Sequence, residues 1–121
     1  MNYKEQEKKY GGIPEHTEMD KLIDWLKICP PTKYTYSVIE VVGRPQVIFM
    51  DFQTGKRVAD CICHYGSYGH ERGLLEAMGA PLVNEEEVGD EVEGWLTAID
   101  ILSRICELPL ETVRRIVRED A

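Results

Sequence analysis

Apolar residues recur along this chain with two different periods, and the change from one period to the other divides it into helices and strands. The first pattern is helical, with apolar residues at positions i, i+3, i+4 and i+7: Met19, Leu22, Ile23 and Leu26. Thr17 precedes this stripe as a suitable N-cap, and Pro30 and Pro31 end it because proline cannot donate a backbone hydrogen bond. The pattern predicts a helix over residues 18–28.

Three runs rich in β-branched and aromatic residues follow, at 34–42, 46–52 and 57–64. Gly43–Pro45 and Thr54–Gly55 separate them, and connections this short join antiparallel neighbours. The sequence therefore predicts a three-stranded antiparallel meander. Its middle strand is apolar at successive positions, so we expect that strand to be covered on both faces or to leave an apolar face open for a partner.

Helical patterns return in the second half of the chain. Glu71–Met78 is expected to form a short helix that ends at Gly79, followed by an acidic loop over residues 80–94. Thr97 suits the N-cap of a further helix, and Pro109 suits the first turn of the last one. The predicted fold class is therefore α+β, with an N-terminal helix, a three-stranded antiparallel β-meander and then three short helices.

A length of 121 residues is that of one domain. We expect residues 17–121 to form a single α+β domain and the polar residues 1–16 to form a flexible N-terminal arm. The chain has no apolar run long enough to span a membrane, and its charged N-terminus lacks the apolar segment of a secretory signal. We therefore expect a cytoplasmic protein whose four cysteines are reduced thiols.

The net charge of −8 lies entirely in the second half of the chain. Residues 61–121 carry thirteen acidic and five basic side chains, whereas the charges of residues 1–60 balance. No Lys or Arg occurs between Arg72 and Arg104. A field of this sign repels nucleic acid and attracts basic protein surfaces. The alternative is a solvated acidic loop that keeps a small protein in solution.

Cys61, Cys63, His64 and His70 are residue types that bind zinc. A single residue between the two cysteines is poor spacing for a zinc site, and alternation along a strand would place His64 on the opposite face from them. A cysteine–histidine nucleophile would need an exposed thiol with a lowered pKa. The simpler interpretation is two half-buried cysteines and two histidines bonded to the turn, so no catalytic residue, metal or cofactor is assigned.

The segment from Leu102 to Val117 resembles a helix-turn-helix. Ser103 would lie where the two helices cross, Leu108 in the turn, and Val113 and Ile116 in the buried face of the second helix. Glu107 stands where that motif usually has glycine. Three arginines could contact phosphates: Arg114, Arg115 and Arg118. A DNA-binding regulator that uses residues 97–118 is therefore one alternative, although the acidic surroundings disfavour direct DNA binding.

Several short motifs occur in order after the third predicted strand: Ser-Tyr-Gly at 67–69, Gly-Leu-Leu-Glu at 73–76, Met-Gly at 78–79 and Val-Glu-Gly-Trp-Leu-Thr-Ala at 92–98. This order resembles that of small proteins encoded by phages and prophages of Gram-positive gut bacteria. The resemblance implies an origin in a mobile element and no catalytic residues. Small accessory phage proteins often act by binding a host protein, and some inhibit CRISPR and other defence systems.

The leading hypothesis is a non-enzymatic protein that binds a host protein in the bacterial cytoplasm, as an anti-CRISPR-like inhibitor of a defence nuclease. Aromatic side chains would anchor the complex: Tyr65, Tyr68 and Trp95. An acidic block would compete with nucleic acid for a basic channel: Glu85, Glu86, Glu87, Asp90, Glu91 and Glu93. A metal- or thiol-dependent site at Cys61, Cys63, His64 and His70 is the second alternative.

Overall fold

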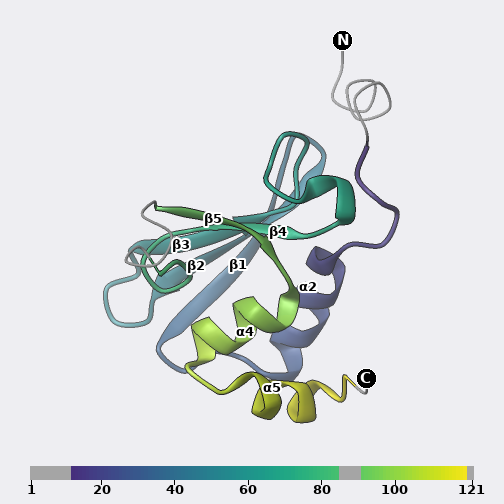
Figure 1. Ribbon diagram of the computed structural model, residues 1–121. Helices are drawn as coiled ribbons and strands as arrows, with labels where there is room; N and C mark the ends of the chain where they lie inside the picture. The colour runs from purple at the N-terminus through teal and green to yellow at the C-terminus, as the bar shows by residue number, and fades with distance from the viewer. Residues whose placement is uncertain (1–11, 85–90, 120–121) are drawn as a thin grey trace.

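The computed structural model describes residues 12–84 and 91–119. Its elements follow in the order α2 (Glu18–Ile28), β1 (Tyr34–Val41), β2 (Arg44–Asp51), β3 (Arg57–Ile62), the 3₁₀ turn η1 (His70–Arg72), β4 (Leu75–Met78), β5 (Val92–Leu96), α4 (Ala98–Cys106) and α5 (Leu110–Val117) (Figure 1). The chain thus combines helices with an antiparallel sheet, and the α+β class is confirmed.

Two of the helix starts that the sequence predicts, at Thr17 and Thr97, are present. The Asp20 carboxylate accepts a hydrogen bond from the Thr17 backbone amide at the start of α2. At the start of α4, Thr97 and Asp100 bond reciprocally: the Asp100 amide donates to the Thr97 hydroxyl, and the Thr97 amide donates to the Asp100 carboxylate. Such capping boxes satisfy backbone donors that a helix leaves free at its N-terminus.

The sheet has five strands in the order β1-β2-β3-β4-β5, and each pair is antiparallel. The three-stranded meander is therefore its first part, and the prediction that only short helices follow was wrong. Residues 75–78 form strand β4 against β3, where Leu75 and Ala77 are buried. Leu, Glu, Ala and Met are good helix formers, but pairing with β3 overrides that local preference.

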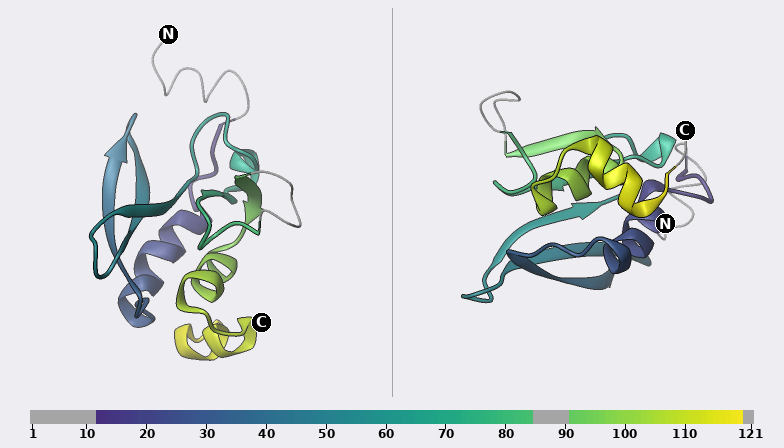
Figure 2. Two further views of the ribbon diagram at one scale, coloured as in Figure 1. Left: turned by 90° about the vertical axis from the view of Figure 1, so that its left-hand side faces the viewer. Right: turned by 90° about the horizontal axis from the view of Figure 1, so that it is seen from below.

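Helices α2, α4 and α5 lie together on one side of the sheet (Figures 1 and 2). The core between the helices and the sheet takes its large side chains from both layers and from the segment after β4: Met19, Leu22, Leu26, Val47, Phe49, Leu75, Leu82, Ile101, Leu102, Ile105 and Val113. Burial of this apolar surface is the main force that holds the helices on the sheet.

The opposite face of the sheet has no helix over it in the described part of the chain (Figure 2). Ile48, Met50 and Ile62 lie on that face and are only partly buried, whereas Val47 and Phe49 on the helix side are fully buried. Of the two arrangements that the sequence left open for the middle strand, the structure shows the one with an uncovered apolar face.

The β1–β2 hairpin ends in a two-residue turn made by Val42 and Gly43, and both have positive φ, of 49° and 78°. Two such residues in a two-residue connection form a type I′ turn, for which Asn-Gly is favoured. A β-branched residue is strained in this region. Val42→Asn is therefore expected to stabilise the protein by about 1 kcal/mol, measured as a higher midpoint in urea. Val41→Asn, a matched change in the strand, is expected to give no gain, and equal shifts would contradict the interpretation.

Residues 12–16 form neither helix nor strand, and Ile13 packs partly buried against the core. The rest of the expected N-terminal arm, residues 1–11, lies outside the described residues. Among the helices that the structure describes, none has the length and apolar character needed to cross a membrane.

Candidate partner-binding surface

The turn that follows β3 is fixed by its own hydrogen bonds. The Ser67 hydroxyl donates to the His64 carbonyl over 2.7 Å and accepts from the His64 amide over 3.0 Å. The His64 ring nitrogen Nε2 lies 3.2 Å from the Pro45 carbonyl, which ties the turn to β2. Further on, the Gly73 carbonyl accepts from the Glu18 amide and links the turn to α2. The segment is therefore a rigid part of the fold rather than a loose loop.

Strand β5 carries a β-bulge. Leu75 pairs with Leu96 and Ala77 pairs with Glu93, so Gly94 and Trp95 together lie opposite Glu76. The extra residue changes which side chains face the helices, because Glu93 and Leu96 both point to the helix side although they are three residues apart.

Trp95 takes the left-handed conformation within this bulge, at φ 63°. A large non-glycine residue in that region costs about 1–2 kcal/mol. Its side chain is nevertheless 53% exposed, so burial recovers only part of that cost. Strained residues of this kind occur preferentially at functional sites, because elsewhere nothing retains them.

The bulge brings Trp95 beside Tyr68. The Trp95 amide donates to the Tyr68 carbonyl over 3.4 Å, and a Cβ atom placed on Gly94 would lie 2.1 Å from the Tyr68 Cβ. A Cβ on Gly69 would likewise lie 3.4 Å from the Trp95 ring. Tyr68 is 58% exposed. We call the four residues Tyr68, Gly69, Gly94 and Trp95 the aromatic corner, where two glycines allow two exposed aromatic residues to lie together.

Tyr65, the third aromatic residue expected to bind a partner, has a different position. Its ring packs edge-on against His70, with centroids 5.5 Å apart, and is partly buried. The His70 Nδ1 atom donates to the Ser67 carbonyl over 2.9 Å, since a carbonyl can only accept. Tyr65 therefore supports the turn from within, next to the aromatic corner rather than as part of it.

Two acidic residues near the corner, Glu76 and Glu93, have structural partners. The Glu76 carboxylate accepts from the Tyr68 amide over 2.6 Å, and the Glu93 carboxylate pairs with Arg104 over 2.8 Å. Glu93 is thus engaged in holding β5 to α4 rather than free for a partner. Glu91, directly before β5, is exposed. The other four acidic candidates, Glu85, Glu86, Glu87 and Asp90, lie outside the described residues.

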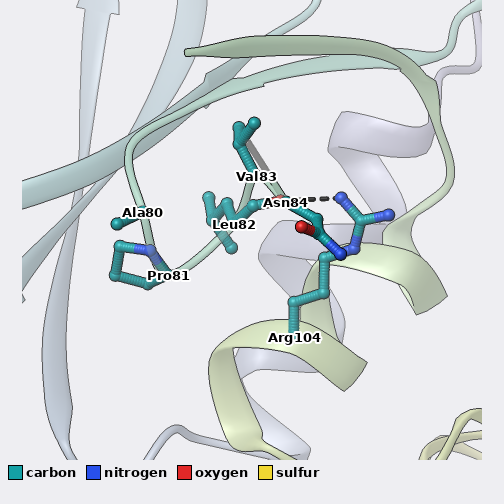
Figure 3. Close-up of a pocket in the computed structure, with 6 residues that line it drawn as sticks. All are labelled: Ala80, Pro81, Leu82, Val83, Asn84 and Arg104. Carbon is teal, nitrogen blue, oxygen red and sulfur yellow. Dashed lines mark hydrogen bonds between the residues drawn. The ribbon is translucent and has the colours of Figure 1, made fainter. Parts of the chain in front are cut away.

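A depression of about 500 Å³ lies between the segment after β4 and helix α4 (Figure 3). Its lining consists of Ala80, Pro81, Leu82, Val83, Asn84 and Arg104. The Arg104 guanidinium donates to the Leu82 carbonyl over 2.7 Å, as the dashed line in Figure 3 shows, and also to Glu93. Because the Arg104 guanidinium already binds the Leu82 carbonyl and the Glu93 carboxylate, it is not available to bind a charged ligand in this depression.

The proposed metal or thiol ligands do not converge. Cys61 and Cys63 are buried on the helix side of the sheet, and the His64 ring forms a hydrogen bond with the Pro45 carbonyl. Within residues 12–84 and 91–119, no three His, Cys, Asp or Glu side chains gather closely enough to hold a metal ion. Burial also raises the pKa of the Cys61 thiol, which suppresses the nucleophilic thiolate.

Helices α4 and α5 are joined by three residues, and the first of them, Glu107, is left-handed with φ 55° and ψ 46°. Glu107 therefore takes the conformation that glycine would take in a helix-turn-helix. In α5, Val113 and Val117 are buried, whereas Ile116 is 38% exposed. The expectation that Ile116 would face the interior was wrong, because the buried stripe of this helix runs through Val117 instead.

Comparison with protein-family models, with curated proteins and with solved structures finds no match to this chain. Arguments about its function therefore rest on its own residues. The sequence alone singled out Tyr68 and Trp95 but not their contact, which depends on β4 and β5. The sequence feature that could have indicated this contact is the glycine beside each aromatic residue, Gly69 and Gly94.

Proposed function

We propose that this protein acts by binding another protein through the aromatic corner, as a phage-type inhibitor of a basic, nucleic-acid-binding host nuclease. The observation that carries the proposal is the exposed pair Tyr68 and Trp95, held together at the cost of a left-handed tryptophan. Tyrosine and tryptophan are the residue types that most often dominate the energy of protein interfaces.

Three further features support a protein partner, and the first of them favours a partner of basic character. The net charge of −8 would steer the chain toward a positive surface and away from nucleic acid. The corner is also supported by hydrogen bonds from both sides, through Glu76 to the Tyr68 amide and through Ser67 within the turn. A rigid aromatic pair loses little conformational entropy when it binds. The resemblance to phage-encoded proteins supports a host protein as the target.

The proposal is tested by capture from a lysate of a Gram-positive gut bacterium with the immobilised full chain. A protein that binds through the corner is expected to be retained by the wild type and to lose at least about 30-fold in affinity with the Tyr68→Ser, Trp95→Asn double variant. Asn tolerates the left-handed backbone, so this variant is expected to fold. The captured protein should also bind nucleic acid less well in the presence of the wild-type chain.

Phe52→Ser is the matched control, since Phe52 is 68% exposed in the β2–β3 turn and lies outside the corner. It is expected to leave capture unchanged. Reversal of Glu85–Glu87 to lysine is expected to slow association and to weaken its dependence on salt. Equal retention of the same proteins by the wild type and the double variant would contradict a role for the corner.

A second candidate function is DNA binding by α4 and α5, favoured by the left-handed turn at Glu107 and by three exposed arginines in α5 or directly after it: Arg114, Arg115 and Arg118. Fluorescence anisotropy of a labelled duplex tests it across a salt series. DNA binding through α5 predicts a steep salt dependence whose slope falls by about one for each arginine changed in Arg114→Ala and Arg115→Ala. Lys27→Ala, an exposed change on α2, is the control. Absence of binding at low salt would remove this candidate.

A further inference from the structure

Two cysteine thiols from opposite parts of the sequence lie in contact at the ends of two helices. The Cys29 and Cys106 sulfurs are 3.9 Å apart, although the residues are 77 positions apart in sequence. Cys29 follows the last residue of α2, and Cys106 is the last residue of α4. The Cys106 thiol donates to the Cys29 carbonyl over 3.5 Å, and the Cys29 thiol donates to the Cys106 sulfur.

We infer that Cys29 and Cys106 form an oxidation site, at which a small-molecule disulfide converts the two thiols into one intramolecular disulfide. The sulfurs need to approach from 3.9 Å to about 2 Å. Both residues lie at helix ends, where the backbone has more freedom than in a helix interior: Cys29 is already outside the helical conformation, and Cys106 precedes the left-handed Glu107. This inference is independent of the function proposed above.

The exchange proceeds in two steps that conserve atoms and electrons. The Cys106 thiol, which is the more exposed of the two, loses its proton to solvent and attacks one sulfur of the small disulfide. A mixed disulfide forms, and one small thiolate leaves and takes up a proton. The Cys29 thiol then loses its proton to solvent, and its sulfur attacks the Cys106 sulfur and expels the second small thiolate, which takes up a proton. Two protein thiols are oxidised, and the reagent is reduced to two thiols.

The surroundings of the four cysteines slow the oxidation of the pair and shield the other two thiols. Burial, and then the neighbouring Cys29, raise the pKa of Cys106 to about 12, so this thiol stays protonated at neutral pH and reacts slowly without an excess of oxidant. Cys61 lies on β3 and Cys63 directly after the end of that strand, and both are buried, which keeps them from a reagent in solvent. Oxidation is therefore directed to Cys29 and Cys106.

The test treats the full chain with millimolar oxidised glutathione at mildly alkaline pH and blocks the remaining thiols in denaturant. The number of alkylated cysteines is expected to fall from four to two, and a non-reduced peptide map is expected to show one linked peptide that contains Cys29 and Cys106. All five strands lie between Cys29 and Cys106 in the sequence, so the disulfide would close a long loop of the unfolded chain. The oxidised chain is therefore expected to have a Tm several degrees higher than that of the reduced chain.

Variants distinguish the two steps. Cys29→Ser is expected to accumulate glutathione on Cys106, because the second step lacks its nucleophile, whereas Cys106→Ser is expected to take up none at Cys29. A Cys61→Ala, Cys63→Ala variant should still form the Cys29–Cys106 disulfide. If that variant does not fold, the non-reduced peptide map of the wild type shows which cysteines are linked. Four free thiols after treatment, stable glutathione on wild-type Cys106, or a disulfide between two chains would each overturn the inference.

Discussion

Gly79→Ala is expected to destabilise the protein by about 3–4 kcal/mol, seen as a fall of about 10 °C or more in Tm. A Cβ atom on Gly79 would lie 2.2 Å from the Val58 carbonyl oxygen and 2.7 Å from the Ala59 Cα. Both are backbone atoms of β3, so they cannot move aside without disturbing the ladder between β3 and β4. Gly79 also has φ 105°, a region that residues with a Cβ rarely adopt, and this strain adds to the clash.

Gly55→Ala is the matched control for this prediction. Gly55 has φ 72°, but a Cβ there would meet no atom within 4 Å. The control therefore measures the conformational strain alone, which is about 1 kcal/mol. Thermal unfolding of both variants followed by circular dichroism gives the comparison. If the two variants lost equal stability, the close approach of Gly79 to β3 would not be what makes glycine necessary there.

The same glycine shows how far local sequence could predict this fold. Gly79 suits the left-handed residue after a helix, and it does adopt positive φ, but it follows a strand. Four residues are too few for a period-two pattern to be distinguished from a helical turn. The alternation of buried Leu75 and Ala77 with the more exposed Glu76 and Met78 becomes clear only once β3 is beside them.

Elements with strong local signals were predicted correctly. The helix α2 has both a cap at Thr17 and a proline stop, and β1 to β3 are joined by turns that local sequence specifies. Strand β5 has neither advantage. Gly94 weakens its strand pattern, and the bulge at Trp95 breaks the alternation that a search for period two would need. The pairing between strands determines the conformation at these positions, and no short stretch of the sequence carries that information.

The candidate surface depends on this same long-range pairing. Tyr68 and Trp95 were each identifiable as exposed aromatic candidates, but 26 intervening residues separate them in the sequence. Their contact arises because the Tyr68 turn precedes β4 while Trp95 lies in its neighbour β5. Of the acidic block, Glu93 is paired with Arg104.

Gly94→Ala is expected to disable the aromatic corner while keeping both of its aromatic side chains. The added Cβ would lie 2.1 Å from the Tyr68 Cβ and 3.2 Å from the Tyr68 carbonyl oxygen, so the Tyr68 backbone has to move away from Trp95. That carbonyl accepts the hydrogen bond from the Trp95 amide, and the displacement breaks it. The expected loss of stability is about 2–3 kcal/mol, from overpacking and the lost bond.

Two readouts separate this local effect from general unfolding. In a Trp25→Phe background, the emission of Trp95 reports the corner alone, and Gly94→Ala is expected to shift it toward that of water-exposed tryptophan. Capture of the partner is expected to fall as far as it does with the Tyr68→Ser, Trp95→Asn variant. Gly66→Ala is the control within the same turn: Gly66 has φ 87° and open space around a Cβ, so it loses about 1 kcal/mol but leaves the emission unchanged. An unshifted emission in Gly94→Ala, or full capture by it, would show that the contact between Gly94 and Tyr68 does not organise the binding surface.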